Sequence, residues 1–347
     1  MSGLVNANRR NFLQAAGTGA AALAASGLGL IQSAHAQTSA ASTSSASSAP
    51  MGPIRQIDTG TLNTGYFEAG PATGPAVLLL HGWPYDIHSF AEVAPLLAAK
   101  GYRVIVPHLR GYGTTTFLSA DTPRNGQQAV LAIDIIELMN ALRIEKAVVA
   151  GYDWGARTAN ILAAIWPERV KAMVSVSGYL IGSREFNKKP LPPKAELLWW
   201  YQFYFTTERG RLGYQQNTHD FAKLIWQLAS PKWNFSDGTF ARSAKSLDNP
   251  DHVAISIHNY RWRLGLAEGE AKYDDLEKRL EQGPPIAVPT ITIEGDANGA
   301  PHPEPAAYAK KFTGKYQHRL LTGGVGHNPP QEVPKGFAQA VIDVDGF

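Results

Sequence analysis

Short runs of apolar residues recur along the chain. Continuous apolar runs of this length are typical of strands that are buried on both faces of a parallel sheet. They predict strands at residues 77–80, 146–150, 170–176 and 286–293, and we expect a further strand at 317–321. Helix-forming residues follow at 156–166 and at 333–342. The pattern therefore predicts an α/β protein, with a mostly parallel central sheet flanked by helices.

A glycine-flanked turn lies between the predicted strand at 146–150 and the helix at 156–166. Its sequence is GYDWGA at residues 151–156, and Asp153 stands at its point. Strand, G-x-D-x-G and helix together form the context of a nucleophile elbow, in which small residues let a strained turn expose one side chain. An aspartate at a helix start is also a common N-cap. Taken alone, the motif supports both interpretations.

The carboxylate at this turn indicates a particular chemistry. With an unperturbed pKa near ~3.9, Asp153 is ionised at neutral pH and needs no base to activate it. It is suited to attack an sp³ carbon and form an alkyl-enzyme ester. Displacement of a strained ring oxygen or of a halide fits such a nucleophile better than acyl transfer. His327, in a glycine-rich loop near the C-terminus, is the candidate base, although a lone loop histidine is often only solvated.

From about residue 54 to its end, the chain resembles the α/β-hydrolase superfamily, in particular the branch that holds soluble epoxide hydrolases, haloalkane dehalogenases and fluoroacetate dehalogenases. The motifs HGWP (81–84), GYDWGA (151–156) and GHNPPQEVP (326–334) carry the resemblance. It implies that Asp153 is the nucleophile, that His327 activates water, that an acid orients this histidine, and that a mostly helical cap covers the pocket. It also implies an oxyanion hole made by the backbone N–H groups of Trp83 and Trp154.

About a hundred residues without strand alternation separate the predicted strands at 170–176 and 286–293, which is too long for a plain loop. We therefore expect a helical cap at 180–285, inserted between core segments 51–179 and 286–347. The cap contains five of the chain's 8 tryptophans. Such rings favour an apolar substrate pocket, although they can also simply pack the cap onto the core. The residues expected to line the pocket are His81, Trp154, Gln202 and Phe205.

Two cap tyrosines distinguish the possible reactions. Tyr201 and Tyr260 lie in segments that resemble the epoxide hydrolase segments whose tyrosines point at the epoxide oxygen. A phenol with a pKa near ~10 is suited to protonate the alkoxide that ring opening releases. A halide leaving group needs no proton. The two tyrosines therefore favour a hydrolase that opens a small apolar or aromatic epoxide to a vicinal diol.

Two alternatives remain open. A haloalkane or haloacid dehalogenase would use the same aspartate and histidine, with the Trp154 indole N–H as a possible halide donor. Against this, the resemblance to fluoroacetate dehalogenases lacks the arginine that follows their nucleophile, because Trp154 stands there, although Arg157 matches a second arginine of that group. The other alternative is a non-catalytic ligand-binding protein, since the same fold can serve without turnover.

The acid that orients the histidine is ambiguous in the sequence. In this superfamily the acid usually lies three residues beyond a glycine that follows the strand, and in IEGDANG at 293–299 that position is Asn298. Asp296 lies one residue beyond the glycine. We expect Asp296 to take the role through a shifted loop. Asn298 is the alternative, because an asparagine can accept the histidine N–H, although it adds no negative charge.

The N-terminal residues carry an export signature. Arg9 and Arg10 form a twin-arginine motif, and an Ala/Gly-rich stretch and an A-x-A cleavage site at residues 34–36 follow it. We expect a signal peptide at 1–36, a Ser/Ala-rich linker at 37–50, and a periplasmic or secreted protein without a membrane anchor after processing.

Composition narrows the function further. The formal charge of +3 falls to +1 when Arg9 and Arg10 leave, so nothing indicates a nucleic-acid partner. The chain has no cysteine and hence no thiol chemistry. Its 10 histidines show no metal-ligand spacing, and no phosphate-binding glycine loop is present. The sequence therefore predicts neither a metal nor a cofactor, and it makes no prediction of an oligomeric state.

Overall fold

The computed structural model describes residues 51–347. The predicted signal peptide at 1–36 and linker at 37–50 lie outside these residues. Within 51–347, no helix has both the length and the apolar character needed to cross a lipid bilayer.

The described residues form a nine-stranded sheet in the order β1-β2-β4-β3-β6-β7-β8-β9, with β5 paired to β2. β1, β2 and β5 pair antiparallel, and the strands from β4 to β9 along this order pair parallel. The predicted α/β fold with a mostly parallel central sheet is confirmed. The strands are β1 (Arg55–Thr59), β2 (Leu62–Ala69), β3 (Ala76–Leu80), β4 (Arg103–Pro107), β5 (Thr116–Phe117), β6 (Ala147–Gly151), β7 (Val170–Val176), β8 (Thr290–Gly295) and β9 (Tyr316–Leu321).

One predicted strand differs in its bounds. The apolar run at 286–293 predicts a strand over its whole length, whereas β8 begins at Thr290. Pro289 directly precedes it and has no N–H to donate to a neighbouring strand. Ile286 forms only an isolated parallel bridge with Phe312.

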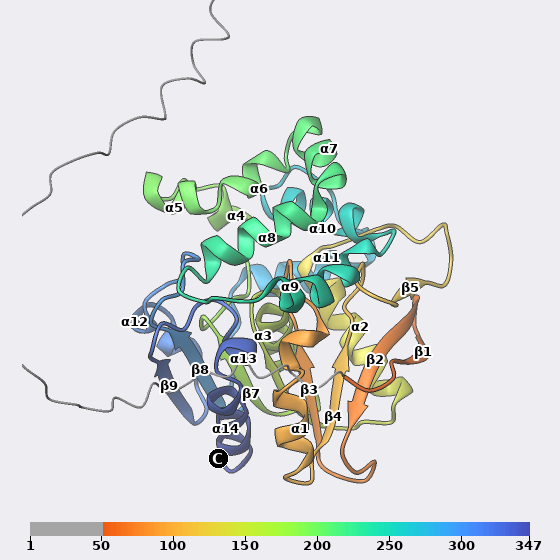
Figure 1. Ribbon diagram of the computed structural model, residues 1–347, viewed down its shortest axis with the longest axis vertical. Coiled ribbons are helices and arrows are strands. Elements are labelled where there is room, and N and C mark those ends of the chain that lie inside the picture. Colours follow the sequence, from red (N-terminus) through yellow and green to blue (C-terminus); the bar gives the residue numbers. More distant parts are fainter. Residues whose placement is uncertain (1–50) are drawn as a thin grey trace, which may run out of the picture. The chain divides into compact units, whose positions relative to one another are not determined.

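Helices cover both faces of the sheet, because its central strands are apolar on both sides. Helices α1 and α14 contact each other on one face, and α2 and α3 contact each other on the other (Figure 1). The helices of the core are α1 (Val93–Ala98), α2 (Gln128–Ala141), α3 (Trp154–Ile165), α12 (Pro305–Tyr308), α13 (Pro329–Glu332) and α14 (Pro334–Asp345).

The range predicted as the cap, residues 180–285, contains helices α4 to α11 and no strand. In Figure 1 these helices lie above the ends of the strands, at the top of the view. Parallel strands bring their carboxyl ends to one edge, where α/β proteins bind ligands. The cap helices are α4 (Arg184–Asn187), α5 (Pro193–Leu198), α6 (Trp200–Tyr204), α7 (Glu208–Gln216), α8 (Thr218–Ala229), α9 (Asp237–Ala244), α10 (His252–Arg263) and α11 (Asp274–Glu281).

The turn between β6 and α3 has a strained backbone at Asp153, with φ 52° and ψ −122°. Positive φ is uncommon for a residue other than glycine and marks a turn that its surroundings enforce. Two glycines make this turn possible. A Cβ on Gly155 would lie 2.0 Å from the carbonyl oxygen of Leu80, and a Cβ on Gly82 would lie 2.4 Å from the Cβ of Asp153. The turn therefore packs against β3 and the residues that follow it, without room for a methyl group.

We predict that Gly155→Ala destabilises the protein by about 1–3 kcal/mol, because the added methyl group meets the backbone of β3, which cannot move aside easily. Thermal or denaturant unfolding measures the change. The matched control is Gly238→Ala in α9, where the nearest atom to an added Cβ is 3.8 Å away. This control should leave stability unchanged or raise it by up to about 1 kcal/mol. Equal stability of Gly155→Ala and the wild type would contradict the close approach of α3 to β3.

Candidate active site

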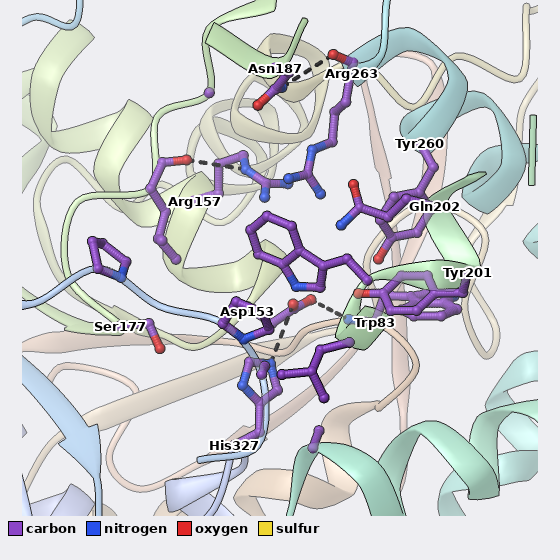
Figure 2. A pocket seen from close by; sticks show the side chains of 18 of the residues that line it. Trp83, Asp153, Arg157, Ser177, Asn187, Tyr201, Gln202, Tyr260, Arg263 and His327 are labelled. Carbon is purple, nitrogen blue, oxygen red and sulfur yellow. Dashed lines mark hydrogen bonds and ion pairs between the residues drawn. The ribbon is translucent and has the colours of Figure 1, made fainter. Parts of the chain in front are cut away.

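A cavity of about 280 Å³ lies between the carboxyl edge of the sheet and the cap. Asp153 and His327 reach it from the core, and Tyr201 and Tyr260 reach it from α6 and α10 (Figure 2). The structure thus brings these four predicted site residues to one cavity. Gln202, also predicted, lines the same cavity.

The two carboxylate oxygens of Asp153 have different partners. The backbone N–H of Trp83 donates to Oδ1 at 2.8 Å, and Oδ2 lies 3.4 Å from Nε2 of His327. Burial alone would raise the pKa of Asp153, but the hydrogen bond and positive charge of His327 outweigh it, so the pKa is lowered. Asp153 is therefore a carboxylate at neutral pH, with one oxygen held by an amide and the other facing the histidine.

The two predicted oxyanion donors differ. The Trp83 amide already contacts the Asp153 carboxylate. Trp154 is the first residue of α3, so its amide is one of the helix N–H groups without an intrahelical acceptor. No hydrogen bond joins the Trp154 amide to the Asp153 carboxylate in the described structure. Trp83 is thus the donor whose geometry is directly observed.

His327 and Asp153 stabilise each other as an ion pair. Burial lowers the pKa of His327, but the hydrogen bond and charge of Asp153 outweigh this effect, and the net pKa is raised. The imidazolium is therefore favoured while Asp153 is ionised. If Asp153 lost its charge by forming an ester, it would no longer raise the pKa of His327. The histidine could then lose its proton and act as a base.

Asn298, and not Asp296, faces the histidine. Asn298 Oδ1 lies 3.2 Å from His327 Nδ1. The Asp296 carboxylate instead accepts the backbone N–H groups of Gly323, Gly324 and Val325 at 2.8–3.0 Å, and these hydrogen bonds lower its pKa. The prediction that Asp296 orients His327 is wrong, because the Asp296 side chain is hydrogen-bonded to the loop at residues 323–325 instead.

The amide of Asn298 is itself oriented by a carboxylate that the sequence analysis missed. Asn298 Nδ2 donates to Glu294 Oε1 at 2.7 Å. This bond points Oδ1 of Asn298 at His327, so the Nδ1–H of the histidine can donate to it, and without a carboxylate at Asp153 the neutral ring would keep its proton on Nδ1 and leave Nε2 as the base. Glu294 is buried, and its charge is one of the influences that raise the pKa of His327. A negative charge therefore supports the histidine through one intervening amide.

A second missed group holds the histidine loop. Glu332, the last residue of α13, accepts the backbone N–H of Gly326 at 2.6 Å and that of Asn328 at 3.0 Å. It also accepts the hydroxyl of Ser230 at 2.7 Å, and the same hydroxyl accepts the His327 N–H at 2.9 Å. Ser230 follows α8 of the cap, so this cluster links the cap to the loop of His327. The motif GHNPPQEVP contains the signal, since Glu332 lies five residues after His327.

The cap tyrosines are proton donors at neutral pH. Burial and the negative charge of Asp153 together raise the pKa of Tyr201 to about 12. Burial likewise raises the pKa of Tyr260 far above its ordinary value. Their ring centroids are 5.4 Å apart, with the planes 85° from parallel. Two protonated phenols thus stand at the cavity of a carboxylate nucleophile candidate.

Three residues expected to line the pocket lie outside it. His81 is buried beneath the cavity, where its ring contacts the Gly82 carbonyl at 3.0 Å and accepts the Leu109 N–H at 3.2 Å. Phe205 is fully buried and packs 5.8 Å from Trp83, measured between ring centroids. The Trp154 side chain is buried and does not line the cavity. These three predictions are wrong. A residue that lies next to a site motif in the sequence can still direct its side chain into the core, away from the cavity.

Within residues 51–347, no group of three or more histidine, aspartate and glutamate side chains is arranged to hold a metal ion.

Comparison with known proteins assigns the family. A model of the alpha/beta hydrolase fold family matches residues 75–217. A solved structure from Klebsiella pneumoniae subsp. pneumoniae, described as a "putative epoxide hydrolase", is 68% identical to this chain; the match covers 85% of this chain and 97% of that protein, with a TM-score of 0.84. The chain therefore belongs to the α/β-hydrolase family.

Curated relatives include both kinds of hydrolase that the sequence suggests. Epoxide hydrolase 3 of Siraitia grosvenorii is 38% identical over 125 residues, which are 35% of this chain and 39% of the relative. Fluoroacetate dehalogenase of a Burkholderia species is 38% identical over 120 residues, which are 34% of this chain and 38% of the relative. The chain spans about two fifths of the length of these curated relatives.

We predict that Asp153→Asn lowers the pKa of His327. The substitution removes the negative charge that raises this pKa, whereas burial, which lowers it, remains. NMR titration of the His327 ring measures the change, and intact mass verifies that the amide persists. Asp296→Asn is the control and should leave the His327 pKa unchanged. A His327 pKa that stays level or rises in Asp153→Asn would refute the ion pair.

The Asn298 contact predicts the tautomer of the neutral histidine. Nitrogen-15 shifts of His327, measured above its pKa in Asp153→Ala, where no carboxylate can accept an Nε2 proton, should show the proton on Nδ1. Asn298→Ala removes the acceptor and should shift the population toward the Nε2–H tautomer, whereas Asp296→Asn should not. The opposite response, with Asp296→Asn changing the tautomer and Asn298→Ala not, would restore Asp296 as the orienting residue.

Proposed function

We propose that this hydrolase opens an epoxide to a vicinal diol through an alkyl ester on Asp153. The observation that carries the proposal is the pair of protonated phenols, Tyr201 and Tyr260, at the cavity of the Asp153 carboxylate. An alkoxide is a poor leaving group unless it is protonated, so ring opening needs such donors. The similarity to proteins named epoxide hydrolases supports the same reaction. The twin-arginine motif supports its location outside the cytoplasm.

In the first step, Asp153 Oδ2 attacks one ring carbon. A new C–O ester bond forms, the C–O bond of the ring breaks, and the electron pair stays on the departing oxygen. Tyr201 or Tyr260 hydrogen-bonds to this oxygen and gives it a proton. Because burial and the Asp153 charge raise the pKa of Tyr201 to about 12, the phenol is protonated at the start and regains its proton readily afterwards.

In the second step, His327 activates water. Ester formation neutralises Asp153, so the charge that raises the pKa of His327 is lost. The imidazolium then gives its Nε2 proton to the tyrosinate through solvent, and Nε2 becomes available as a base. His327 takes a proton from water, and the hydroxide attacks Cγ of Asp153. The Trp83 N–H, 2.8 Å from Oδ1, stabilises the oxyanion. Collapse of this intermediate breaks the ester bond, and the remaining proton of the added hydroxyl passes to the departing alkoxide. The diol is released, and the Asp153 carboxylate is again paired with the His327 imidazolium.

The second candidate is hydrolysis of an organohalide by the same aspartate and histidine. Two observations favour it: a curated relative is a fluoroacetate dehalogenase, and Trp154 Nε1 is buried without a hydrogen-bond acceptor among the described residues. A halide could accept that N–H. The indole nevertheless does not line the cavity, and the tyrosines would have no proton to deliver. A third possibility is ligand binding without turnover. It would not explain why the cavity contains both the ion pair of Asp153 and His327 and the two phenols.

Trapping the ester tests the proposal. His327→Gln lacks the base, so incubation with an aryl epoxide should add the mass of the whole epoxide to the protein, and the adduct should map to Asp153. Asp153→Ala with His327→Gln should form no adduct. A bromoalkane is tested separately. An alkyl adduct from the bromoalkane alone would favour the dehalogenase, and no adduct from either reagent would overturn the ester mechanism.

The leaving group is tested in the same assay. Tyr201→Phe with Tyr260→Phe should slow adduct formation from the epoxide by a factor on the order of 10²–10⁴, because the alkoxide loses its proton donors. Alkylation by the bromoalkane, if it occurs, should change far less. Equal loss with both reagents would mean that the tyrosines only shape the cavity.

A further inference from the structure

Two arginines from different parts of the fold enter the same cavity. Arg157 lies on α3, four residues after Asp153, and Arg263 is the last residue of α10 in the cap. Both line the cavity together with Asp153, and Figure 2 shows their guanidinium groups turned toward each other. An apolar epoxide would give neither arginine a partner.

Neither guanidinium has a carboxylate partner among the described residues. Arg157 Nε donates to the Leu180 carbonyl at 3.2 Å, and the Arg263 guanidinium lies 5.5 Å from the centroid of the Tyr260 ring. Asp153 is the one acidic residue among those that line the cavity, and its oxygens face the Trp83 amide and His327 instead.

A buried arginine elsewhere in this protein has the carboxylate partner that is typical of an arginine with a structural role. Arg110 binds both oxygens of Asp134 through two hydrogen bonds of 2.6 Å, and its pKa is raised. Arg157 is in the opposite situation. Burial and the positive charge of Arg263 together lower its pKa to about 10. Both guanidinium groups carry a positive charge at neutral pH, and like charges that lie close together repel each other. An anion between them would relieve this repulsion.

We propose that Arg157 and Arg263 bind a carboxylate group of the substrate, so that the substrate class is an epoxy carboxylic acid. This inference rests on the proposed epoxide opening at Asp153. A planar guanidinium matches a carboxylate in geometry and charge. Four residues of helix advance about 6 Å along the axis, so the carboxylate site and the nucleophile lie within one small molecule of each other. Water adds across the ring and the carboxylate is unchanged, so the product is a dihydroxy acid.

The rest of the cavity suits the hydrocarbon part of such an acid. Six apolar residues line the same cavity, most of them from cap helices α4, α5 and α8: Ile181, Phe186, Leu198, Trp199, Ile225 and Leu228. The cavity therefore combines two positive charges with apolar surface. A ligand with one anionic end and a short apolar body is complementary to both.

The test compares two substrates that differ only in charge, 3-phenyloxirane-2-carboxylate and its primary amide. In the wild-type protein, kcat/KM for the carboxylate should exceed that for the amide by a factor on the order of 10–100, the range expected for charged hydrogen bonds. Arg263→Gln should reduce this ratio at least tenfold, mainly through KM for the carboxylate. Arg263→Lys, which keeps the charge, should lose less.

A matched control removes a positive charge from the same cap without touching the cavity. Arg209 is exposed on α7 and does not line the cavity, so Arg209→Gln should leave the carboxylate-to-amide ratio unchanged. If Arg209→Gln and Arg263→Gln lowered the ratio equally, general attraction of anions would explain the preference and the specific site would be refuted.

A binding measurement separates failure of this inference from failure of the proposed function. Calorimetry with cinnamate and cinnamamide, which have no epoxide, should give at least tenfold tighter binding of the carboxylate to wild type and a loss of that preference in Arg263→Gln. Equal turnover of both epoxides would keep the epoxide hydrolase and overturn the carboxylate site. If neither epoxide reacts but cinnamate binds through Arg263, the carboxylate site stands and the epoxide reaction fails. Equal binding of cinnamate and cinnamamide would overturn the site.

Discussion

The negative charge of Asp153 inside a cavity is the constraint around which the site is built. A buried carboxylate without partners is costly, so it must meet donors and positive charge. The Trp83 amide holds one oxygen and the His327 ring faces the other. The same charge raises the pKa of Tyr201 and opposes the fall in the pKa of Arg157. One ionised group thus contributes to the pKa of a candidate base, of a candidate acid and of a cation.

The support of the histidine shows how a site can function when its usual acid is replaced. Asn298 accepts a hydrogen bond from Nδ1–H of His327, and Glu294 accepts a hydrogen bond from the Asn298 amide and so fixes its orientation. A carboxylate in direct contact would stabilise the imidazolium more strongly, because electrostatic attraction falls with distance. In the proposed mechanism, the neutral amide would let the histidine give up its proton more easily once Asp153 is an ester. The ion pair stabilises the imidazolium only while Asp153 is ionised.

The sequence predicted those parts of the site that depend on local patterns. Apolar runs located the central strands, and the G-x-D-x-G context located the strained turn at Asp153, because glycines at fixed offsets are a local requirement. Contacts between loops were not predictable in this way. The position of Asp296 depends on three amides of residues 323–325, far along the chain. For the same reason, no pattern within α10 indicated that Arg263 would reach the cavity of Asp153.

The balance of charge in the cavity connects the proposed mechanism to the proposed substrate class. Before reaction, the carboxylate of Asp153 partly offsets the positive charges of Arg157 and Arg263. Ester formation removes that carboxylate, and with a neutral substrate the cavity would then hold two cations and no anion. An approaching proton on His327 would add a third positive charge, which would make the histidine a weaker base. A carboxylate on the substrate keeps the arginines compensated during the ester stage, so the group that anchors the substrate also preserves the basicity that the second step requires.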